Sequence, residues 1–130
     1  MAVLFNKRDP IYLQVVQNLK QKIVSGALQP GQEVPSRREL ANQLKINPNT
    51  VQRAYKEMED EGLLYTEGNL PSRITENKDV LRTLKQSMIQ QAVDEFVSAI
   101  TSIHVSPEEV LQLVKEKLTK PTNKGGQPNA

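Results

Sequence analysis

Residues 46–62, INPNTVQRAYKEMEDEG, decide the fold that this sequence predicts. Asn47 can accept hydrogen bonds from the free backbone N–H groups at the start of a helix. Pro48 suits the first helical position, where a missing N–H costs nothing. Gly62 is a typical helix end. The stretch therefore predicts a short helix that the proline begins rather than breaks.

The preceding residues predict a second short helix. Ser36 and Glu39 stand three positions apart, the spacing of a capping box in which each side chain satisfies a backbone donor of the other. Lys45 and Ile46 then leave room only for a tight turn. Two short helices joined in this way form a helix-turn-helix.

The flanking residues complete a winged helix. Asp9 and Pro10 predict the cap and first residue of an earlier helix. A short extended piece is expected at Glu33–Val34. After the helix-turn-helix, residues 63–68 and 73–75 are β-prone runs that predict a hairpin. The expected fold class is mainly α (α+β), with an N-terminal winged helix-turn-helix over residues 1–75.

After the winged helix, residues 76–119 predict two helices that serve dimerisation. Ser106 and Pro107 begin the second of them. The first spans about residues 77–104, and its apolar side is too long for the second helix to cover, so we expect it to pair with another copy. The tail at residues 120–130 is expected to be disordered. The expected dimerisation residues are Leu81, Leu84, Met88, Val93, Phe96, Ile100 and Ile103.

Composition excludes several classes of function. The 130 residues include no cysteine, which rules out disulfides, thiolate metal sites and cysteine nucleophiles. The single histidine, His104, has no triad or metal partner in view, so we expect no enzyme, no metal and no cofactor. Neither a signal peptide nor a membrane-spanning run is visible, which predicts a cytoplasmic protein.

The charge is concentrated in one segment. The net charge is only +2, but residues 36–56 hold five cations against Glu39, a local balance of +4. Such a compact basic patch suits an anionic partner, although a solvated charged surface is the alternative reading. Arg37 and Arg38 lie in the first turn of a helix, where cations oppose the dipole, and this favours a role in phosphate binding.

The helix that begins at Asn47 has two different faces when its residues are placed 100° apart. One face is apolar and fit for the core: Val51, Ala54, Tyr55 and Met58. The opposite face offers two amides and two cations, Asn49, Gln52, Arg53 and Lys56. Amides and cations are the groups that read base edges and hold phosphates in a major groove. The acidic residues lie at the far end of the helix, where they can stay clear of a duplex.

Residues 26–68, GALQPGQEVPSRRELANQLKINPNTVQRAYKEMEDEGLLYTEG, resemble the winged-helix domain of the GntR family of bacterial transcription regulators. The motif NPNTVQRAY, residues 47–55, is most similar to the small YtrA-type subfamily. The resemblance implies that Arg38 holds a phosphate or base edge and that Arg53 flanks the contacts of the recognition helix. Asn49, Thr50 and Gln52 would lie where family members contact operator DNA.

The sequence differs from the usual pattern of this family at two places. Pro48 stands where some relatives carry a contacting arginine. The wing sequence GNLPSRIT differs from the usual family ending, although Gly68 can make its turn and Arg73 is expected to reach the minor groove. In YtrA-type proteins, short C-terminal helices dimerise and the targets are often transporter operons.

The leading hypothesis is a homodimeric repressor that binds a palindromic operator in double-stranded DNA, with a transporter operon as the candidate target. The alternative is an interaction module that docks an acidic protein or structured RNA. An enzyme is the weakest option. The expected DNA-binding residues are Ser36, Arg37, Arg38, Asn47, Asn49, Thr50, Gln52, Arg53, Lys56 and Arg73.

Overall fold

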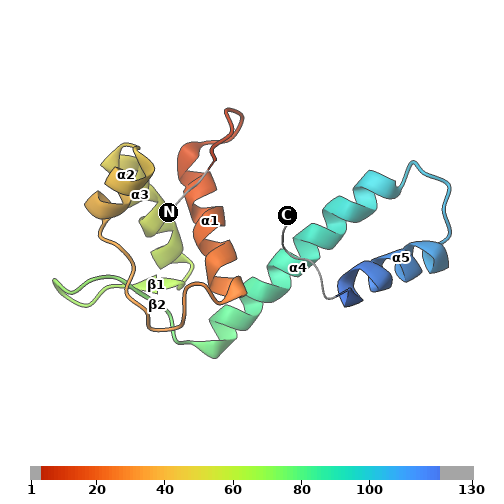
Figure 1. Cartoon of the computed structure of the whole chain (residues 1–130). Coiled ribbons are helices and arrows are strands. Elements are labelled where there is room, and N and C mark those ends of the chain that lie inside the picture. The colour runs from red at the N-terminus through yellow and green to blue at the C-terminus, as the bar shows by residue number, and fades with distance from the viewer. Residues whose placement is uncertain (1–3, 121–130) are drawn as a thin grey trace. The chain divides into compact units, whose positions relative to one another are not determined.

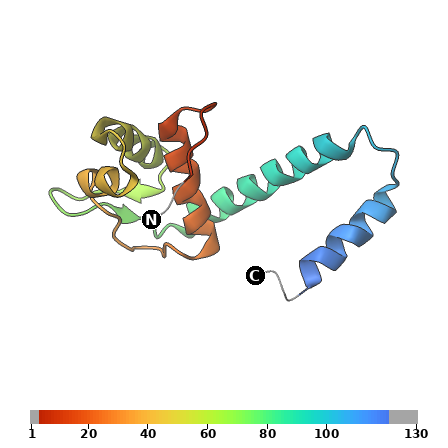
Figure 2. The same ribbon diagram turned by 45° about the horizontal axis from the view of Figure 1, so that its top comes forward.

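The computed structural model describes residues 4–120 and falls into two compact units, Met1–Gln91 and Ala92–Ala130. Figures 1 and 2 show mainly helical elements with one small hairpin, which confirms the predicted fold class. Apart from Lys120, the tail predicted at residues 120–130 lies outside the described residues. The elements are α1 (Ile11–Ser25), α2 (Arg37–Leu44), α3 (Pro48–Asp60), β1 (Leu64–Tyr65), β2 (Arg73–Ile74), α4 (Lys78–Ile100) and α5 (Pro107–Thr119).

The helix-turn-helix forms as predicted because its caps form. The hydroxyl of Ser36 accepts the backbone N–H of Glu39 at 3.0 Å, and the Glu39 carboxylate accepts the N–H of Ser36 at 2.9 Å. These bonds lower the pKa of Glu39. Asn47 caps α3 by accepting the N–H of Asn49 at 2.8 Å. Lys45 makes the turn with a φ of 57°.

The start of α1 differs from the prediction by one residue. Pro10 is extended and precedes the helix, which begins at Ile11 without a side-chain cap. The side chain of Asn6 organises the approach instead, because it accepts the backbone N–H groups of Arg8 and Asp9 at 2.9 and 3.0 Å. Asp9 is therefore not the helix cap.

The hairpin is antiparallel, and Leu64 pairs with Ile74. The expected extended piece adds to it, since Glu33 forms a β-bridge with Arg73. Gly68 has a φ of 57° in the connection, a conformation that glycine adopts without strain. The wing is thus a small sheet to which three segments of the chain contribute.

The core of the first unit lies where α3 packs against α1 and α2. Each fully buried aliphatic side chain there contributes about 1.5–3 kcal/mol relative to its exposed state. The largest fully buried side chains include Tyr55, Leu19, Leu40, Met58, Leu63 and Ile74. The predicted apolar face of α3 is confirmed, because Val51, Ala54, Tyr55 and Met58 are all buried.

The first part of α4 also belongs to this core. Leu84 is only 6% exposed, and Leu81 and Met88 pack against the same cluster. These three residues were predicted to mediate dimerisation, but within one chain Leu84 is buried and Leu81 and Met88 are half-buried, because the small winged helix leaves an apolar side open to α4. The first unit consequently extends to Gln91, beyond the boundary predicted after residue 75.

The second unit contains the end of α4 and all of α5. Ser106 caps α5 as predicted, by accepting the N–H of Glu109 at 3.2 Å. No residue between positions 92 and 120 is buried. An apolar hollow of about 450 Å³ lies within the unit, lined among others by Val93, Phe96, Ile100 and Leu111. In residues 4–120 we find no helix with the length and apolar character to cross a membrane.

Candidate nucleic-acid interface

The exposed face of α3 carries the polar side chains that the sequence predicted there. Asn49, Gln52, Arg53 and Lys56 are all exposed, while Thr50 is half-buried at the start of the helix. The oxygen of the Asn47 side chain is occupied by capping, so this residue shapes the start of α3. The face thus presents amide and cationic groups together on one rigid helix.

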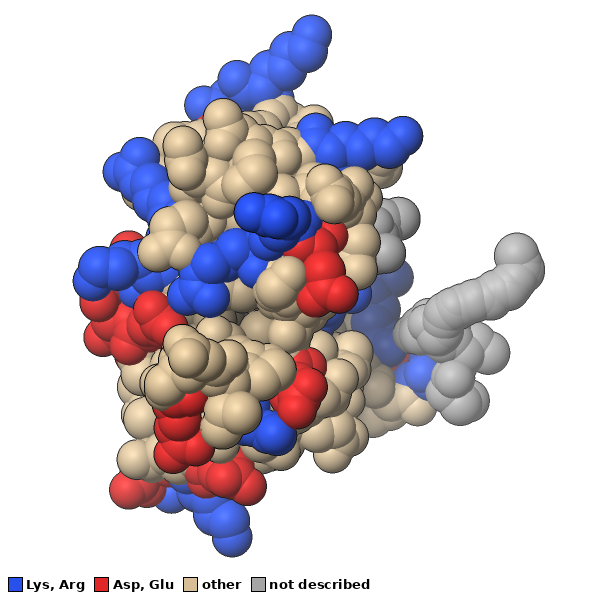
Figure 3. Space-filling view, turned by 90° about the vertical axis from the view of Figure 1, so that its left-hand side faces the viewer, with Lys and Arg blue, Asp and Glu red and all other residues tan. Residues whose placement is uncertain are grey.

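Figure 3 looks at the molecule from the side of α2, α3 and the hairpin. Lys and Arg side chains predominate over the upper part of this face, and Asp and Glu side chains lie mainly below them. The separation of sign gives this side of the first unit an electropositive region suited to a polyanion.

Arg38 is an unpaired cation in the described part of this region. Its side chain is exposed at the start of α2, and within residues 4–120 it makes no hydrogen bond or ion pair. Ser36, one of the predicted contacts, uses its hydroxyl oxygen to cap the same helix. An unpaired guanidinium beside a recognition helix is well suited to hold a phosphate.

Arg37, the preceding residue, points into the domain. Its Nη2 lies 3.4 Å from Glu59 Oε2, its Nε donates to Gln52 Oε1, and its guanidinium lies 5.0 Å from the centre of the Tyr55 ring. Nη1 also donates to the Ser72 hydroxyl at 3.4 Å. Partners within the domain engage three of the five N–H donors of Arg37, so its position does not favour the predicted phosphate contact.

Tyr55 lies beneath this arginine with its hydroxyl satisfied. The hydroxyl donates to the backbone carbonyl of Pro35 at 2.7 Å. Burial raises the pKa of Tyr55 to about 12, against a smaller opposing effect of the Arg37 charge. The tyrosine is thus a neutral core residue that anchors the entry to α2.

Arg53 and Lys56 are partly engaged but remain at the surface. The guanidinium of Arg53 lies 3.9 Å from the centre of the Tyr12 ring, which braces it against the start of α1. Lys56 pairs with Asp60 at 2.9 Å one turn later, and this hydrogen bond raises the pKa of Lys56. Exposed pairs of this kind are weak, so Lys56 stays available to an anion.

Arg73 does not reach outward from the wing. Its guanidinium donates to the carbonyl of Gly31 and to the Glu33 carboxylate, both at 2.9 Å. It therefore holds the third segment of the sheet, and its minor-groove contact stays a prediction. The wing tip TEGNLP, residues 66–71, carries Glu67 and no cation.

The acidic end of α3 has partners that sequence reasoning missed. Glu59 pairs with Arg37, Asp60 with Lys56, and Glu61 with Lys20 of α1 at 2.9 Å. Glu57 has a raised pKa because it shares a hydrogen bond with Glu61. The sequence places these acids at the far end of the helix, but spacing along the chain gives no way to choose their partners on α1 and α2.

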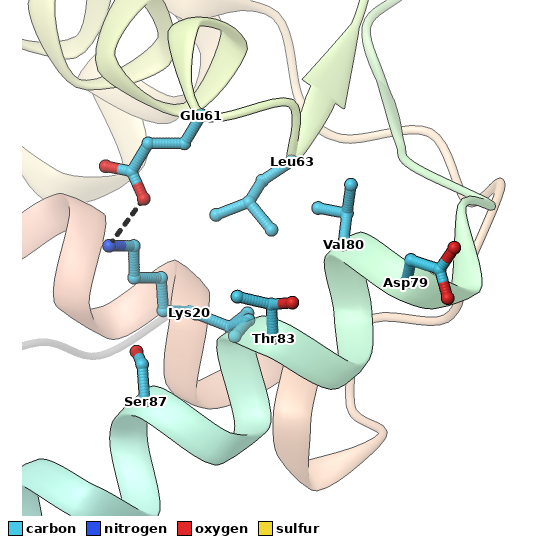
Figure 4. Close-up of a pocket in the computed structure, with 8 residues that line it drawn as sticks. Lys20, Glu61, Leu63, Asp79, Val80, Thr83 and Ser87 are labelled. Carbon is cyan, nitrogen blue, oxygen red and sulfur yellow. Dashed lines mark ion pairs between the residues drawn. The ribbon is translucent and has the colours of Figure 1, made fainter.

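The first unit has a hollow of about 310 Å³ between α1, the end of α3 and the start of α4 (Figure 4). The Lys20–Glu61 pair borders it, and Leu63 and Val80 give it apolar walls. Because Lys20 is already paired, the hollow offers no free cation. Residues 4–120 also contain no cluster of three or more His, Cys, Asp or Glu that could hold a metal ion.

Comparisons with known proteins give a consistent result. Residues 11–74 match the family described as bacterial regulatory proteins, gntR family. The HTH-type transcriptional repressor YtrA of Bacillus subtilis is 36% identical over 121 residues, which cover 92% of this chain and 92% of that protein.

Two solved structures extend the likeness to three dimensions. A GntR family transcriptional regulator from Listeria monocytogenes has a TM-score of 0.80 and 33% identity, covering 86% of this chain and 98% of that one. The DNA-binding domain of AraR in complex with operator ORX1 has a TM-score of 0.54 and 26% identity, covering 58% of this chain and 96% of that one.

Proposed function

Because the chain belongs to the gntR family of bacterial regulatory proteins, and so is a DNA-binding transcriptional regulator rather than an enzyme, we propose that it is a homodimeric repressor of a palindromic operator. We place it in the cytoplasm, where a bacterial regulator meets its DNA. By the YtrA-type resemblance of its sequence, the regulated genes encode a transporter.

The exposed face of α3 is the observation that carries this proposal. Asn49 and Gln52 present amide groups near the start of the helix, the end with which a recognition helix meets base edges. Arg38 and Arg53 flank them and supply cations for the phosphates. That the DNA-binding domain of AraR, a similar structure, is solved with operator DNA supports the same use of this face.

A single copy of this face reads too little sequence. One recognition helix contacts only a few base pairs, while a genome offers about 10⁶–10⁹ competing sites. Two copies related by a two-fold axis double the base contacts and require a palindromic operator. A dimer is therefore the form in which this interface becomes specific.

The second unit supplies a surface for that dimer. Its apolar side chains stay open to solvent, with Phe96 42% and Leu111 66% exposed. A pair of helices in which nothing is buried between residues 92 and 120 lacks the core that a folded unit needs. A second copy covers this surface, so Val93, Phe96, Ile100 and Ile103 remain our proposed dimerisation residues.

Selection of bound sequences from a random DNA pool tests the proposal. We expect a two-fold symmetric motif whose half-site centres lie roughly 10 bp apart. Inserting about five base pairs between half-sites turns one of them by half a turn and is expected to abolish tight binding. A pool without an enriched motif would instead favour the module that docks an acidic protein or structured RNA.

A further inference from the structure

Arg37 is fixed in place by partners from two other elements. Glu59 and Gln52 of α3 accept hydrogen bonds from its guanidinium, and the Tyr55 ring lies below it. Ser72, just before β2, accepts a further bond at 3.4 Å. With three acceptors and an aromatic ring around it, the guanidinium has one preferred position.

The partners of Arg37 are themselves held. The hydroxyl of Thr66 donates to the same Glu59 carboxylate oxygen at 2.8 Å. It also lies 2.5 Å from the hydroxyl of Ser72. The cluster therefore ties α2, α3 and the hairpin together, and Arg37 cannot turn away without breaking several bonds at once.

This arrangement decides which end of the Gln52 amide faces outward. An arginine N–H can only donate, so the group that meets Arg37 Nε must be the carbonyl oxygen of Gln52. The NH₂ end of the amide is then directed away from Arg37, on the exposed face of α3. Gln52 offers hydrogen-bond donors to a ligand, while its carbonyl oxygen is turned toward Arg37.

We propose that Arg37 is a positioning residue that makes Gln52 a reader of guanine. This inference rests on the proposed function, because it assumes that α3 enters the major groove. Guanine presents two adjacent acceptors there, N7 and O6, which match an outward NH₂ group.

The other bases fit such an amide less well. Adenine pairs with a glutamine through one donor and one acceptor, and the carbonyl oxygen of Gln52 is turned toward Arg37 and away from such a pair. Cytosine offers only a donor, and thymine offers one acceptor beside a methyl group. Without Arg37 the amide is free to use both of its ends, and adenine becomes the favoured partner.

Random-pool selection with full-length variants tests this inference. The base pair read by Gln52 is the one at which Gln52→Ala loses its preference. At that position we expect guanine for the wild-type protein. For Arg37→Met we expect the preference for guanine over adenine to fall on the order of tenfold, with preferences at other positions unchanged.

Two further variants separate positioning from folding. Arg37→Met/Glu59→Gln removes the carboxylate that would otherwise lose its partner, and it is expected to show the same change of base. Arg82→Met removes an arginine that pairs with Asp79 on α4 and is expected to leave every preference as in the wild type. A merely structural role of Arg37 would weaken all positions alike and change the base at none.

Each outcome decides the matter. Adenine or a pyrimidine at the Gln52 position of the wild type overturns the inference, even if the Arg37 variants fail to fold. An unchanged preference for guanine in folded Arg37→Met overturns it as well. A wild-type pool that enriches no motif overturns the proposed function itself, which distinguishes the two failures.

Discussion

Arg37 and Arg38 are neighbours in the first turn of α2, yet their side chains have opposite surroundings. Arg37 is held by acceptors inside the domain, whereas Arg38 is exposed and makes no ion pair among residues 4–120. A cation at a helix start opposes the dipole by only about 0.3–1 kcal/mol, a cost that one ion pair or one phosphate offsets. The two arginines are therefore expected to respond differently to mutation.

The first prediction distinguishes residues that read bases from residues that bind phosphates. Gln52→Ala and Asn49→Ala are each expected to cost about 1–3 kcal/mol on the operator and to leave non-specific binding nearly intact. Arg38→Ala is expected to weaken both kinds of binding and to reduce the salt slope by about 1, because it removes a phosphate contact. Titrations of operator and random DNA at several salt concentrations measure these effects.

Arg82→Ala provides a matched control, since it removes an exposed arginine of α4 that pairs with Asp79. It is expected to leave the affinity for the operator within a factor of about two. Equal losses on operator and random DNA for Gln52→Ala would contradict its assigned role in reading bases.

Tyr55 carries the second prediction, which concerns pH. Its pKa is raised from the usual value of 10 to about 12, chiefly by burial. The neutral phenol therefore stabilises the fold fully below pH 10, and this contribution is lost as the pH rises from about 10 to about 12. A shift of this size corresponds to at most about 2–3 kcal/mol.

Urea unfolding of the wild type and Tyr55→Phe tests this. At neutral pH the variant is expected to be less stable by about 1–3 kcal/mol, because the Pro35 carbonyl loses its donor. Between pH 10 and 12 the difference is expected to shrink, since phenylalanine does not ionise. A difference that stays constant across this range would show that Tyr55 does not titrate as its burial demands.

Among the elements, the caps explain why such short helices form where they do. α2 has only eight residues, too few to be stable alone, and its capping box satisfies donors that would otherwise face water. α4 differs from these short helices, because it is one continuous helix whose two ends belong to different units. Its first half fills the winged-helix core, and its last residues belong to the second unit.

The cap of α2 gives the third prediction. Ser36→Ala is expected to lower the free energy of unfolding by about 1 kcal/mol, because the backbone N–H of Glu39 loses its acceptor. Ser36→Thr keeps a hydroxyl in place and is expected to lose much less. Chemical unfolding followed by circular dichroism measures both, and equal effects of the two substitutions would argue against the cap.

At the scale of the whole molecule, the second unit has an apolar surface that is exposed to solvent. Phe96 and Val93 are about half exposed in a hollow lined by other aliphatic residues. Exposed apolar clusters of this kind mark interaction sites. We therefore propose that assembly decides both the stability of this unit and the specificity of DNA binding.

The fourth prediction tests that assembly. Phe96→Asp is expected to give monomers by sedimentation, because it places a charge in the apolar surface. Ser102→Asp adds the same charge at an exposed position that does not line the hollow and is expected to leave the dimer intact. A Phe96→Asp protein that remains dimeric would place the interface elsewhere.

A truncated chain of residues 1–91 gives a complementary measurement. It keeps Leu84 and its neighbours in the winged-helix core, which a truncation before Asn77 would remove. We expect a folded monomer with only weak DNA binding. Full affinity of this monomer for the operator would contradict the dimeric proposal.

The sequence by itself determined the features that depend on near neighbours along the chain. The caps at Ser36 and Asn47 and the buried face of α3 follow from groups within about four residues of one another, so spacing alone predicts them. The resemblance of residues 26–68 added the family and the recognition helix. The same local reasoning failed by one residue at Pro10, because α1 begins without a side-chain cap and Asn6 instead orders the residues before it.

Only the tertiary structure decided which of the predicted cations are free. The partners of Arg37 lie 15, 22 and 35 positions away, and those of Arg73 lie 40 and 42 positions away. Likewise, the apolar side of α4 was visible in the sequence, but its division between core and open surface was not. Helical periodicity shows which side chains share a face, whereas the partner of that face depends on how distant segments pack.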